Sequence, residues 1–329
     1  MFCKVQRGRL DPAFPTSTRR SSFAASHLEV RMFNVGEGEC ILVAFPNDRA
    51  WIVDCGSGNS STGDNQKLGA RVAAYLNERG LKLEALVPSH PHIDHAGGYR
   101  WLLQAGTLVA PKVWLFRGAE AWDPTRTWIR DLNQELAGLS FFEEVALEDS
   151  QRVFPMEDGI TAHLFAGSGD GAYTSVWLHI RYHEARLLLT GDVHCRYEKR
   201  LLWLFTDYDF GSDLLKITHH GSSSGTSTEF VQRTRPGLSI ASTANDDGHR
   251  LEQDTLGRLG GLGQPRRVFE THVDGDIVVL TDGRSYGDGI LYEVDLEAPG
   301  RFAADLGASV LPLSTVDQSR TSTPDAACE

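Results

Sequence analysis

The chain contains, at residues 89–98, the stretch Ser89-His90-Pro91-His92-Ile93-Asp94-His95-Ala96-Gly97-Gly98. Its imidazole and carboxylate groups are ligands that suit zinc, manganese and iron. Side chains two positions apart in an extended segment point the same way, so we expect His90 and His92 to bind one ion together. Asp94 and His95 come where the chain turns, and we expect them to bind a second ion beside the first. The stretch therefore predicts a binuclear metal site.

Two later segments end in residues that would complete such a site. The apolar run Leu187-Leu188-Leu189-Thr190 leads into Gly191-Asp192, and a carboxylate at a strand end can bridge two cations. The strand-like run Lys216-Ile217-Thr218 leads into His219-His220. Taken alone, either segment is also typical of a surface loop. Taken together with the first motif, the residues that end both segments become candidate ligands. The predicted metal ligands are His90, His92, Asp94, His95, Asp192 and His219.

The order of predicted elements indicates the fold class. Three short strand-like segments lie at residues 28–34, 40–45 and 50–54, joined by turn residues. Helical spacing follows at residues 68–79, and a strand at residues 83–87 runs into the histidine motif. Strands and helices then alternate over the second half. This pattern predicts an α/β fold, an αββα sandwich of two mixed β-sheets flanked by helices.

Composition divides the chain into three parts. Residues 1–27 are basic at first and then rich in small residues, without the apolar stretch of a signal peptide, so we expect a disordered leader or a start codon upstream of the domain. Residues 28–300 form the predicted domain with the αββα fold, which contains all the metal-ligand motifs. Residues 301–329 form a C-terminal extension, which we expect to be disordered from about residue 314 because Ser, Thr and Asp dominate there.

Charge and cysteine content exclude several classes of protein. The formal net charge is −12, which argues against a protein that clamps long DNA. No apolar run of about 18 residues occurs, so we expect no membrane insertion. The five cysteines are an odd number without CxxC spacing, which argues against a disulfide framework and against a cysteine-type zinc site. We therefore expect a reducing, cytoplasmic location.

These motifs, in this order, resemble the metallo-β-lactamase superfamily. More narrowly, they resemble the soluble hydrolase domain of ComEC-type competence proteins, over residues 30–283. The resemblance begins at Phe33-Asn34-Val35-Gly36-Glu37-Gly38-Glu39 and continues through Ile52-Val53-Asp54-Cys55-Gly56, the histidine motif, and the Gly-Asp and His-His segments. A later element, residues 245–249, resembles one that ends in a histidine near the same pocket. The resemblance implies that Asp54 supports a ligand histidine from behind the metals.

The chain departs from the family pattern at two places. The superfamily often supplies another ligand histidine between the first motif and Asp192. This interval holds His163, His179 and His183, which fall within or beside predicted strands, so we interpret them as structural. The opening motif also carries Glu37 and Glu39 where relatives often have Gln and Asp.

The predicted function is that of a metal-dependent hydrolase. Two divalent ions, Zn or Mn, would share a hydroxide that attacks phosphorus or a carbonyl carbon. The predicted catalytic residues are Asp94, together with His220 and His249. His220 would contact a substrate oxygen or protonate the leaving group, and His249 would do the same or stabilise its loop.

Several functional alternatives remain open at this stage. The favoured substrate is a phosphodiester, as for a phosphodiesterase or nuclease. A lactone, thioester or β-lactam could be hydrolysed by the same site, and a degenerate sensor or partner subunit would keep the fold without the chemistry. The expected partners are a phosphodiester or other small hydrolysable substrate, with nucleic acid among the possibilities, and a protein that supplies the basic surface which this acidic chain lacks.

Overall fold

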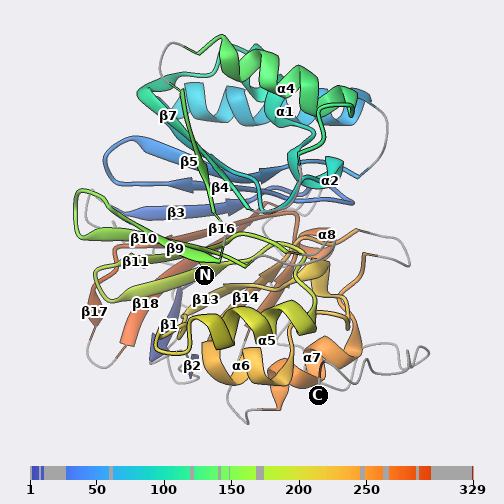
Figure 1. Ribbon diagram of the computed structural model, residues 1–329. Coiled ribbons are helices and arrows are strands. Elements are labelled where there is room, and N and C mark those ends of the chain that lie inside the picture. Colours follow the sequence, from blue (N-terminus) through green and yellow to red (C-terminus); the bar gives the residue numbers. More distant parts are fainter. Residues whose placement is uncertain are drawn as a thin grey trace.

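The structure is a computed structural model, and it describes residues 2–6, 9–10, 27–58, 62–118, 122–139, 142–147, 149–167, 174–244, 249–261, 267–286, 289–297 and 328. Two β-sheets pack face to face, and helices cover the outer face of each sheet (Figure 1). This arrangement confirms the predicted αββα sandwich. The domain limits at residues 28 and 300 stay a prediction.

Within the described residues, the first sheet has eleven strands, in the order β2-β1-β18-β16-β3-β4-β5-β6-β7-β8 with β17 beside β18. Strand β5 is antiparallel to β4 and parallel to β6, so the antiparallel and parallel parts of the sheet meet there. The strands are β1 (Phe2–Gln6), β2 (Arg9–Leu10), β3 (Leu28–Met32), β4 (Cys40–Ala44), β5 (Arg49–Cys55), β6 (Lys82–Val87), β7 (Val109–Arg117), β8 (Phe142–Ala146), β16 (Asp276–Thr281), β17 (Ser285–Tyr286) and β18 (Gly289–Glu297).

In the part of the chain that the structure describes, the second sheet has seven strands, in the order β15-β14-β13-β12-β11-β10-β9. Strands β9 to β12 are antiparallel, whereas β12 to β15 are parallel. The strands are β9 (Ser150–Pro155), β10 (Ile160–Ala166), β11 (Trp177–Tyr182), β12 (Ala185–Leu189), β13 (Leu214–Lys216), β14 (Leu238–Ala241) and β15 (Arg267–Glu270).

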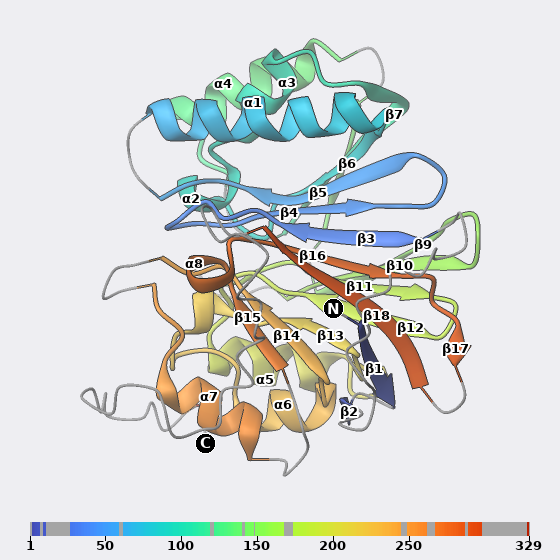
Figure 2. The ribbon, with the colours of Figure 1, turned by 180° about the vertical axis from the view of Figure 1, so that it is seen from behind.

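Helices form the two outer layers (Figure 2). The first sheet is covered by α1 (Thr62–Arg79), α3 (Tyr99–Gln104) and α4 (Thr127–Ala137), with the short α2 (Ile93–Ala96) beyond the end of β6. The second sheet is covered by α5 (Cys195–Leu204), α6 (Thr228–Thr234) and α7 (Gln253–Gly260). Two single turns, η1 (His219–Gly221) and α8 (Thr271–Asp274), follow strands β13 and β15. Within the described residues, no helix is long and apolar enough to cross a membrane.

Side chains that alternate in direction along the strands form a hydrophobic core on both faces of each sheet. Ile41 and Val43 of β4 pack between the sheets, while Leu42 faces the helices of the first layer. In β12, Leu187 packs between the sheets and Leu188 faces the helices of the second layer. Successive side chains of a strand point to opposite faces, so each sheet needs both a sheet and a helix layer to cover it.

The first residues of the chain differ from the sequence-based expectation. Residues 1–27 were expected to form a leader without structure, but strands β1 and β2 lie within them. Strand β1 pairs antiparallel with β18, from Phe2 opposite Glu293 to Val5 opposite Ile290. An edge strand presents a row of unpaired N–H and C=O groups, and another strand can bond to them whatever its composition. The predicted disordered tail from about residue 314 lies outside the described residues, apart from Cys328.

Cys195 and Cys328 form a disulfide, so the argument from cysteine number and spacing against disulfides is wrong for this pair. Their Cα atoms are 5.2 Å apart although 133 positions separate them in sequence. The tertiary structure brings the two cysteines together, so their spacing in the sequence could not predict this disulfide. The backbone of Cys328 also accepts a hydrogen bond from Thr228 N at 3.2 Å. Among the described cysteines, Cys40 and Cys55 are free and buried.

We predict that Cys328→Ser lowers the free energy of unfolding by about 2–4 kcal/mol, because a disulfide limits the freedom of the unfolded chain. Urea unfolding without reductant measures the difference between variant and wild type. Dithiothreitol should bring the wild type to the stability of the variant and leave the variant unchanged. A wild type whose unfolding midpoint ignores dithiothreitol would mean that this disulfide does not form.

Candidate metal centre

The residues that follow β6 are held against the end of β5 by very close backbone contacts. Glu39 N donates to Asp94 O at 2.9 Å, and Gly98 N donates to Cys55 O at 2.7 Å. A Cβ atom on Gly56 would lie 2.2 Å from the carbonyl carbon of Asp94. Only glycine therefore allows β5 and the histidine motif to approach this closely.

Asp54 fixes the orientation of His95. The Asp54 carboxylate is fully buried and accepts hydrogen bonds from Ser89 N at 2.6 Å and Ser89 Oγ at 2.7 Å. It also lies 2.8 Å from His95 Nδ1. A proton on Nδ1 leaves Nε2 to face the opposite side, where Asp192 lies. This is the contact expected for Asp54, and its role in metal binding stays a prediction.

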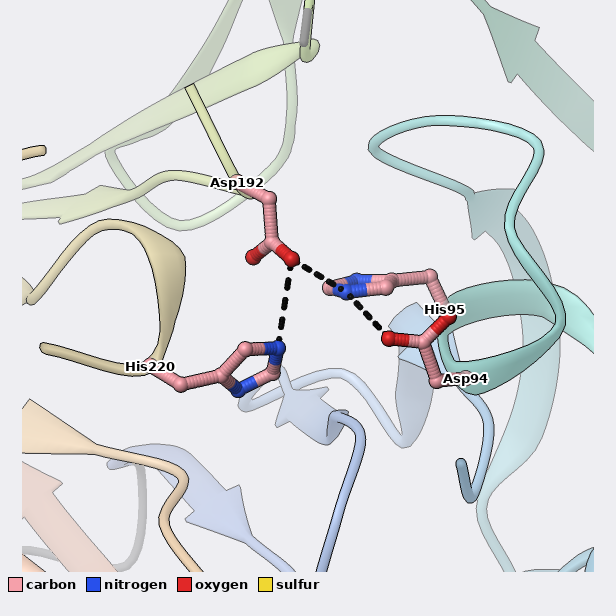
Figure 3. Close-up of side chains that lie close together, drawn as sticks. All are labelled: Asp94, His95, Asp192 and His220. Atoms are coloured by element: carbon pink, nitrogen blue, oxygen red, sulfur yellow. Dashed lines mark hydrogen bonds and ion pairs between the residues drawn. The ribbon is translucent and has the colours of Figure 1, made fainter. Parts of the chain in front are cut away.

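Four of the side chains converge in space (Figure 3). Asp94, His95, Asp192 and His220 each offer a ligand atom, and these four atoms lie within 4.8 Å of one another. His95 Nε2 is 3.0 Å from Asp192 Oδ2 and 3.4 Å from Asp94 Oδ2, and His220 Nε2 is 3.2 Å from Asp192 Oδ2. The first two residues follow strand β6 of the first sheet, and the other two follow strands β12 and β13 of the second sheet, so the centre lies between the two halves of the sandwich.

His90 and His92 lie beside this group. His90 Nε2 is 2.9 Å from His92 Nδ1, and the His90 ring centroid is 4.2 Å from that of His95. Burial lowers the pKa of His90 well below its usual value, and the neighbouring His95 lowers it further. A neutral imidazole keeps a lone pair for a metal. The structure thus brings both histidines to the place where the sequence predicted them.

Asp192 is buried among positive partners. The Asp192 carboxylate has a pKa well below its usual value: burial raises it, but the charges of His220 and His95 lower it more. The same contacts raise the pKa of His95 and of His220 against the effect of burial. The Asp192 carboxylate therefore favours the charged form of both histidines.

The structure places His219 and His220 differently from the sequence-based expectation. His219 was expected to bind an ion and His220 to act on the substrate. His220 is the one inside the four-residue group, whereas His219 Nδ1 bonds Ser224 Oγ at 2.8 Å and its ring stacks on His194 at 4.9 Å. Both have left-handed backbones, with φ of 49° and 53°, so their side chains diverge. Spacing along a strand could not predict this turn.

His249 lies at the rim of the centre. Its ring centroid is 5.7 Å from that of His220, and its Nε2 is 3.3 Å from Glu37 Oε1. The side chains of His249 and Glu37 are 26% and 35% exposed, so this pair stays open to solvent while the ligand group is buried. The structure therefore brings His249 near the predicted ligands. Its catalytic role stays a prediction.

A buried lysine behind Asp192 was not recognised as part of the site. Lys216 and Glu39 form an ion pair with both side chains fully buried, and Lys216 Nζ is 3.9 Å from Asp192 Oδ1 and 3.4 Å from Gly191 O. In the sequence, Lys216 appeared only as the first residue of the strand-like run that leads into His219 and His220. A lysine in a short buried strand needs an opposite charge nearby. A search for an acidic partner of Lys216 could therefore have predicted the ion pair.

The three histidines between the histidine motif and Asp192 in the sequence lie outside the four-residue group. His179 Nδ1 bonds the Tyr208 hydroxyl at 2.8 Å, His163 Nδ1 bonds Gln151 at 3.0 Å, and the His183 ring packs on Tyr182. Ser175 occupies the interior beside Asp192, and its Oγ accepts a hydrogen bond from Asp192 N at 3.0 Å. A Cβ atom on Gly191 would lie 2.6 Å from Ser175 Oγ and 2.4 Å from Ser89 Cβ, which leaves no room for a larger side chain.

One buried carboxylate supports the strained turn that carries His220. Glu198 of α5 accepts hydrogen bonds from Thr226 N at 2.6 Å, Ser227 N at 2.7 Å and Thr218 Oγ1 at 3.0 Å. Left-handed backbones cost about 1–3 kcal/mol each in non-glycine residues, so they persist only where neighbours hold them. Glu198 ties both sides of the turn to the helix that follows Asp192.

The residues present fit a divalent metal. The donor set of imidazoles and carboxylates suits zinc or manganese. Among the described residues, His220 Nε2 is one of the buried polar atoms that lack a hydrogen bond of good geometry. Such atoms are costly unless something binds them, and a cation in the group would do so. The site is thus a candidate His/Asp metal centre.

Comparison with known proteins identifies relatives of this chain. A sequence model of the metallo-beta-lactamase superfamily matches residues 34–272. The uncharacterized protein YcaI of Escherichia coli is 25% identical over 228 residues, which cover 69% of this chain and 27% of YcaI. ComE operon protein 3 of Bacillus subtilis is 28% identical over 272 residues, which cover 77% of this chain and 33% of that protein. The chain thus spans about a third or less of these relatives, and the resemblance to ComEC-type proteins is confirmed.

One solved structure is similar to this chain over part of its length. The metallo-beta-lactamase fold protein YhfI from Bacillus subtilis is 14% identical and superposes with a TM-score of 0.48, covering 76% of this chain and 98% of YhfI.

We predict that Glu198→Gln lowers the free energy of unfolding by about 1–3 kcal/mol, because the amide nitrogen would face a backbone N–H and leave it buried without an acceptor. Thermal or urea unfolding at pH 7 measures the effect. Glu78→Gln on the exposed face of α1 is the matched control, and it should stay within about 0.5 kcal/mol of wild type. Equal stabilities for the two variants would show that Glu198 does not hold the turn.

Proposed function

Since the chain belongs to the metallo-beta-lactamase superfamily, we propose that it is a metal-dependent hydrolase of phosphodiesters. The observation that carries the proposal is the convergence of Asp94, His95, Asp192 and His220 within 4.8 Å, with His90 and His92 beside them. All the residue types are metal ligands, and His90, His95, Asp192 and His220 are buried. A cluster of this kind is far more costly as a purely structural feature than as an ion site.

The ligands divide between two ions in this proposal. His90 and His92 would hold one ion, and Asp94, His95 and His220 would hold the other. Asp192 would contribute to the same centre. Ions bound there would lower the pKa of a coordinated water to about 7 and stabilise charge that develops on oxygen. We assign zinc or manganese to the site from its mixture of imidazoles and carboxylates.

Other residues orient this group and exchange protons with the substrate. Asp54 keeps His95 in the tautomer whose Nε2 faces Asp192. Lys216 stands behind Asp192 on the side of Oδ1, so Oδ2 is the oxygen directed at the cluster. His249, whose Nε2 lies 3.3 Å from Glu37 Oε1 at the solvent-exposed rim, would give a proton to a departing oxygen.

An exposed arginine favours an anionic substrate. Arg126, just before α4, donates from Nη1 to Pro91 O at 3.2 Å, inside the histidine motif. It is exposed, and its charge lowers the pKa of His92, although burial is the larger cause of that shift. A cation at the rim attracts a phosphate and offers nothing to a neutral lactone. This arginine supports a phosphodiester over a neutral ester or amide.

The proposed function is tested by a metal and substrate screen. The purified chain is analysed for bound metal, stripped with EDTA, and assayed with Mn²⁺, Zn²⁺ and Mg²⁺ on bis-p-nitrophenyl phosphate, nitrocefin and a lactone. We expect hydrolysis of the phosphodiester that EDTA abolishes and Mn²⁺ or Zn²⁺ restores. Hydrolysis confined to nitrocefin or the lactone would contradict the substrate class. A metal-free chain that hydrolyses none of them would indicate a sensor or partner subunit.

We predict that Asp192→Asn and His90→Ala each lower kcat for the phosphodiester by about 100-fold or more, since even a residue that only supports a metal ligand contributes about 10–100-fold. Metal content should fall in parallel. Circular dichroism on the same samples checks that the fold is kept. His183→Asn is the matched control, because this exposed histidine has a left-handed backbone that Asn tolerates. A ligand variant that keeps a tenth of wild-type kcat would contradict its assigned role.

A further inference from the structure

Helix α5 exposes a basic stripe with a tryptophan at its end. Its buried face consists of Cys195, Glu198, Leu201 and Leu202. The opposite face has residues at positions i, i+3, i+4 and i+7, which form one line along a helix. We call these residues, Arg196, Lys199, Arg200 and Trp203, the α5 stripe.

The composition of the α5 stripe is unusual for this chain. The net charge of the chain is −12, yet three cations follow one another on this face. The Trp203 side chain is 75% exposed, although tryptophan is on average a highly buried residue. Arg200 lies 3.5 Å from Asp149, but both side chains are about 40% exposed, so water weakens this pair. Cations interleaved with an exposed aromatic ring are typical of a surface that binds single-stranded nucleic acid.

The α5 stripe begins next to the candidate metal centre. Helix α5 starts three positions after Asp192, and His194 precedes its first residue. The His194 ring stacks on His219, whose ring centroid is 6.3 Å from that of His220. From Arg196 to Trp203 the helix rises about 10 Å, at about 1.5 Å per residue. The helix lies on the outside of the second layer (Figure 1), so a ligand could follow the stripe from solvent towards the centre.

We propose that the α5 stripe binds single-stranded nucleic acid and guides it to the metal centre. Arg196, Lys199 and Arg200 contact phosphates, and Trp203 stacks on a base. This inference rests on the proposed phosphodiesterase function and adds the class of substrate and its path. Three cations are too few to hold a long duplex against the charge of the chain, but they are enough for a short single strand whose bases also stack.

An anionic membrane is the other surface that such a stripe could meet. A helix that lies in a membrane interface needs a broad apolar face. Trp203 is the one large apolar residue exposed on α5, and the other exposed large apolar side chains of the described residues lie on or beside α2, β7, β9 and α8. The observations therefore favour nucleic acid, and vesicle binding becomes an outcome of the test.

The test measures binding of a fluorescent 20-residue oligo-dT by anisotropy across a salt series, in EDTA so that no strand is cut. Three phosphate contacts predict a slope of log affinity against log salt of roughly −2, at about 0.7 for each contact. The variant R196Q/K199Q/R200Q should lose most of its affinity at low salt and bring the slope close to zero. K67Q/K82Q/R152Q removes three exposed cations from α1, β6 and β9, and it should bind as wild type does.

Trp203 is tested separately. Trp203→Ala should weaken oligo-dT binding about five-fold or more, the smallest effect expected from the loss of one stacked base. Trp203→Phe should recover most of that affinity, because a phenyl ring still stacks. Circular dichroism and thermal unfolding check every variant, and all four positions are exposed or half-exposed, so the fold should be kept.

Three results would overturn the proposal. The first is a wild type that does not bind oligo-dT at low salt, and the second is a stripe variant that binds as well as the control. The third is stripe-dependent binding to phosphatidylserine vesicles, or to a duplex of equal length, that is tighter than binding to oligo-dT. Hydrolysis of bis-p-nitrophenyl phosphate by the wild type is measured independently. Its absence would refute the proposed function, while stripe-dependent binding of the oligonucleotide would still support this surface.

Discussion

The Asp192 carboxylate depends on positive charge from both halves of the sandwich. His95 from the first layer and His220 from the second lie about its Oδ2, and Lys216 from the second sheet lies behind its Oδ1. Lys216 in turn pairs with Glu39, which immediately precedes β4 of the first sheet. Removing one partner of a buried ion pair leaves a charge that costs several kcal/mol. The centre is therefore also a joint between the two sheets, and binding chemistry and packing share the same residues.

Much of the fold and of the centre follows from local patterns in the sequence. The end of β6 could be predicted because an apolar strand stops at closely spaced histidines, whereas the role expected for Asp54 came from the resemblance to the metallo-β-lactamase superfamily. What could not be predicted depends on distant residues or on backbone twist. The Glu39–Lys216 and Cys195–Cys328 pairs join residues far apart in sequence. His220 turns inward, and His219 outward, through left-handed backbone angles that spacing does not encode.

The α5 helix shows why surface function is harder to recognise than a metal motif. The number of cations on this helix is ordinary, and the net charge of the whole chain, −12, does not reveal that they are grouped. Their alignment becomes apparent only once Cys195 and Glu198 are known to face inward, because this fixes which side of the helix meets water. The same helix carries the disulfide and the Glu198 hydrogen bonds, so it is tied firmly to the turn that bears His220.

The glycines at the centre have an evolutionary consequence. Gly56 and Gly191 lie where a single methyl group would collide with Asp94 and with Ser89. Their requirement is geometric, and it holds whether or not an ion binds. A homologue that lost its histidines but kept both glycines would retain the same loops around an inactive cavity. A homologue that lost either glycine must have rebuilt the approach of its loops. In a comparison of homologues, these two glycine positions therefore distinguish proteins that lost only the metal ligands from proteins whose loops changed structure.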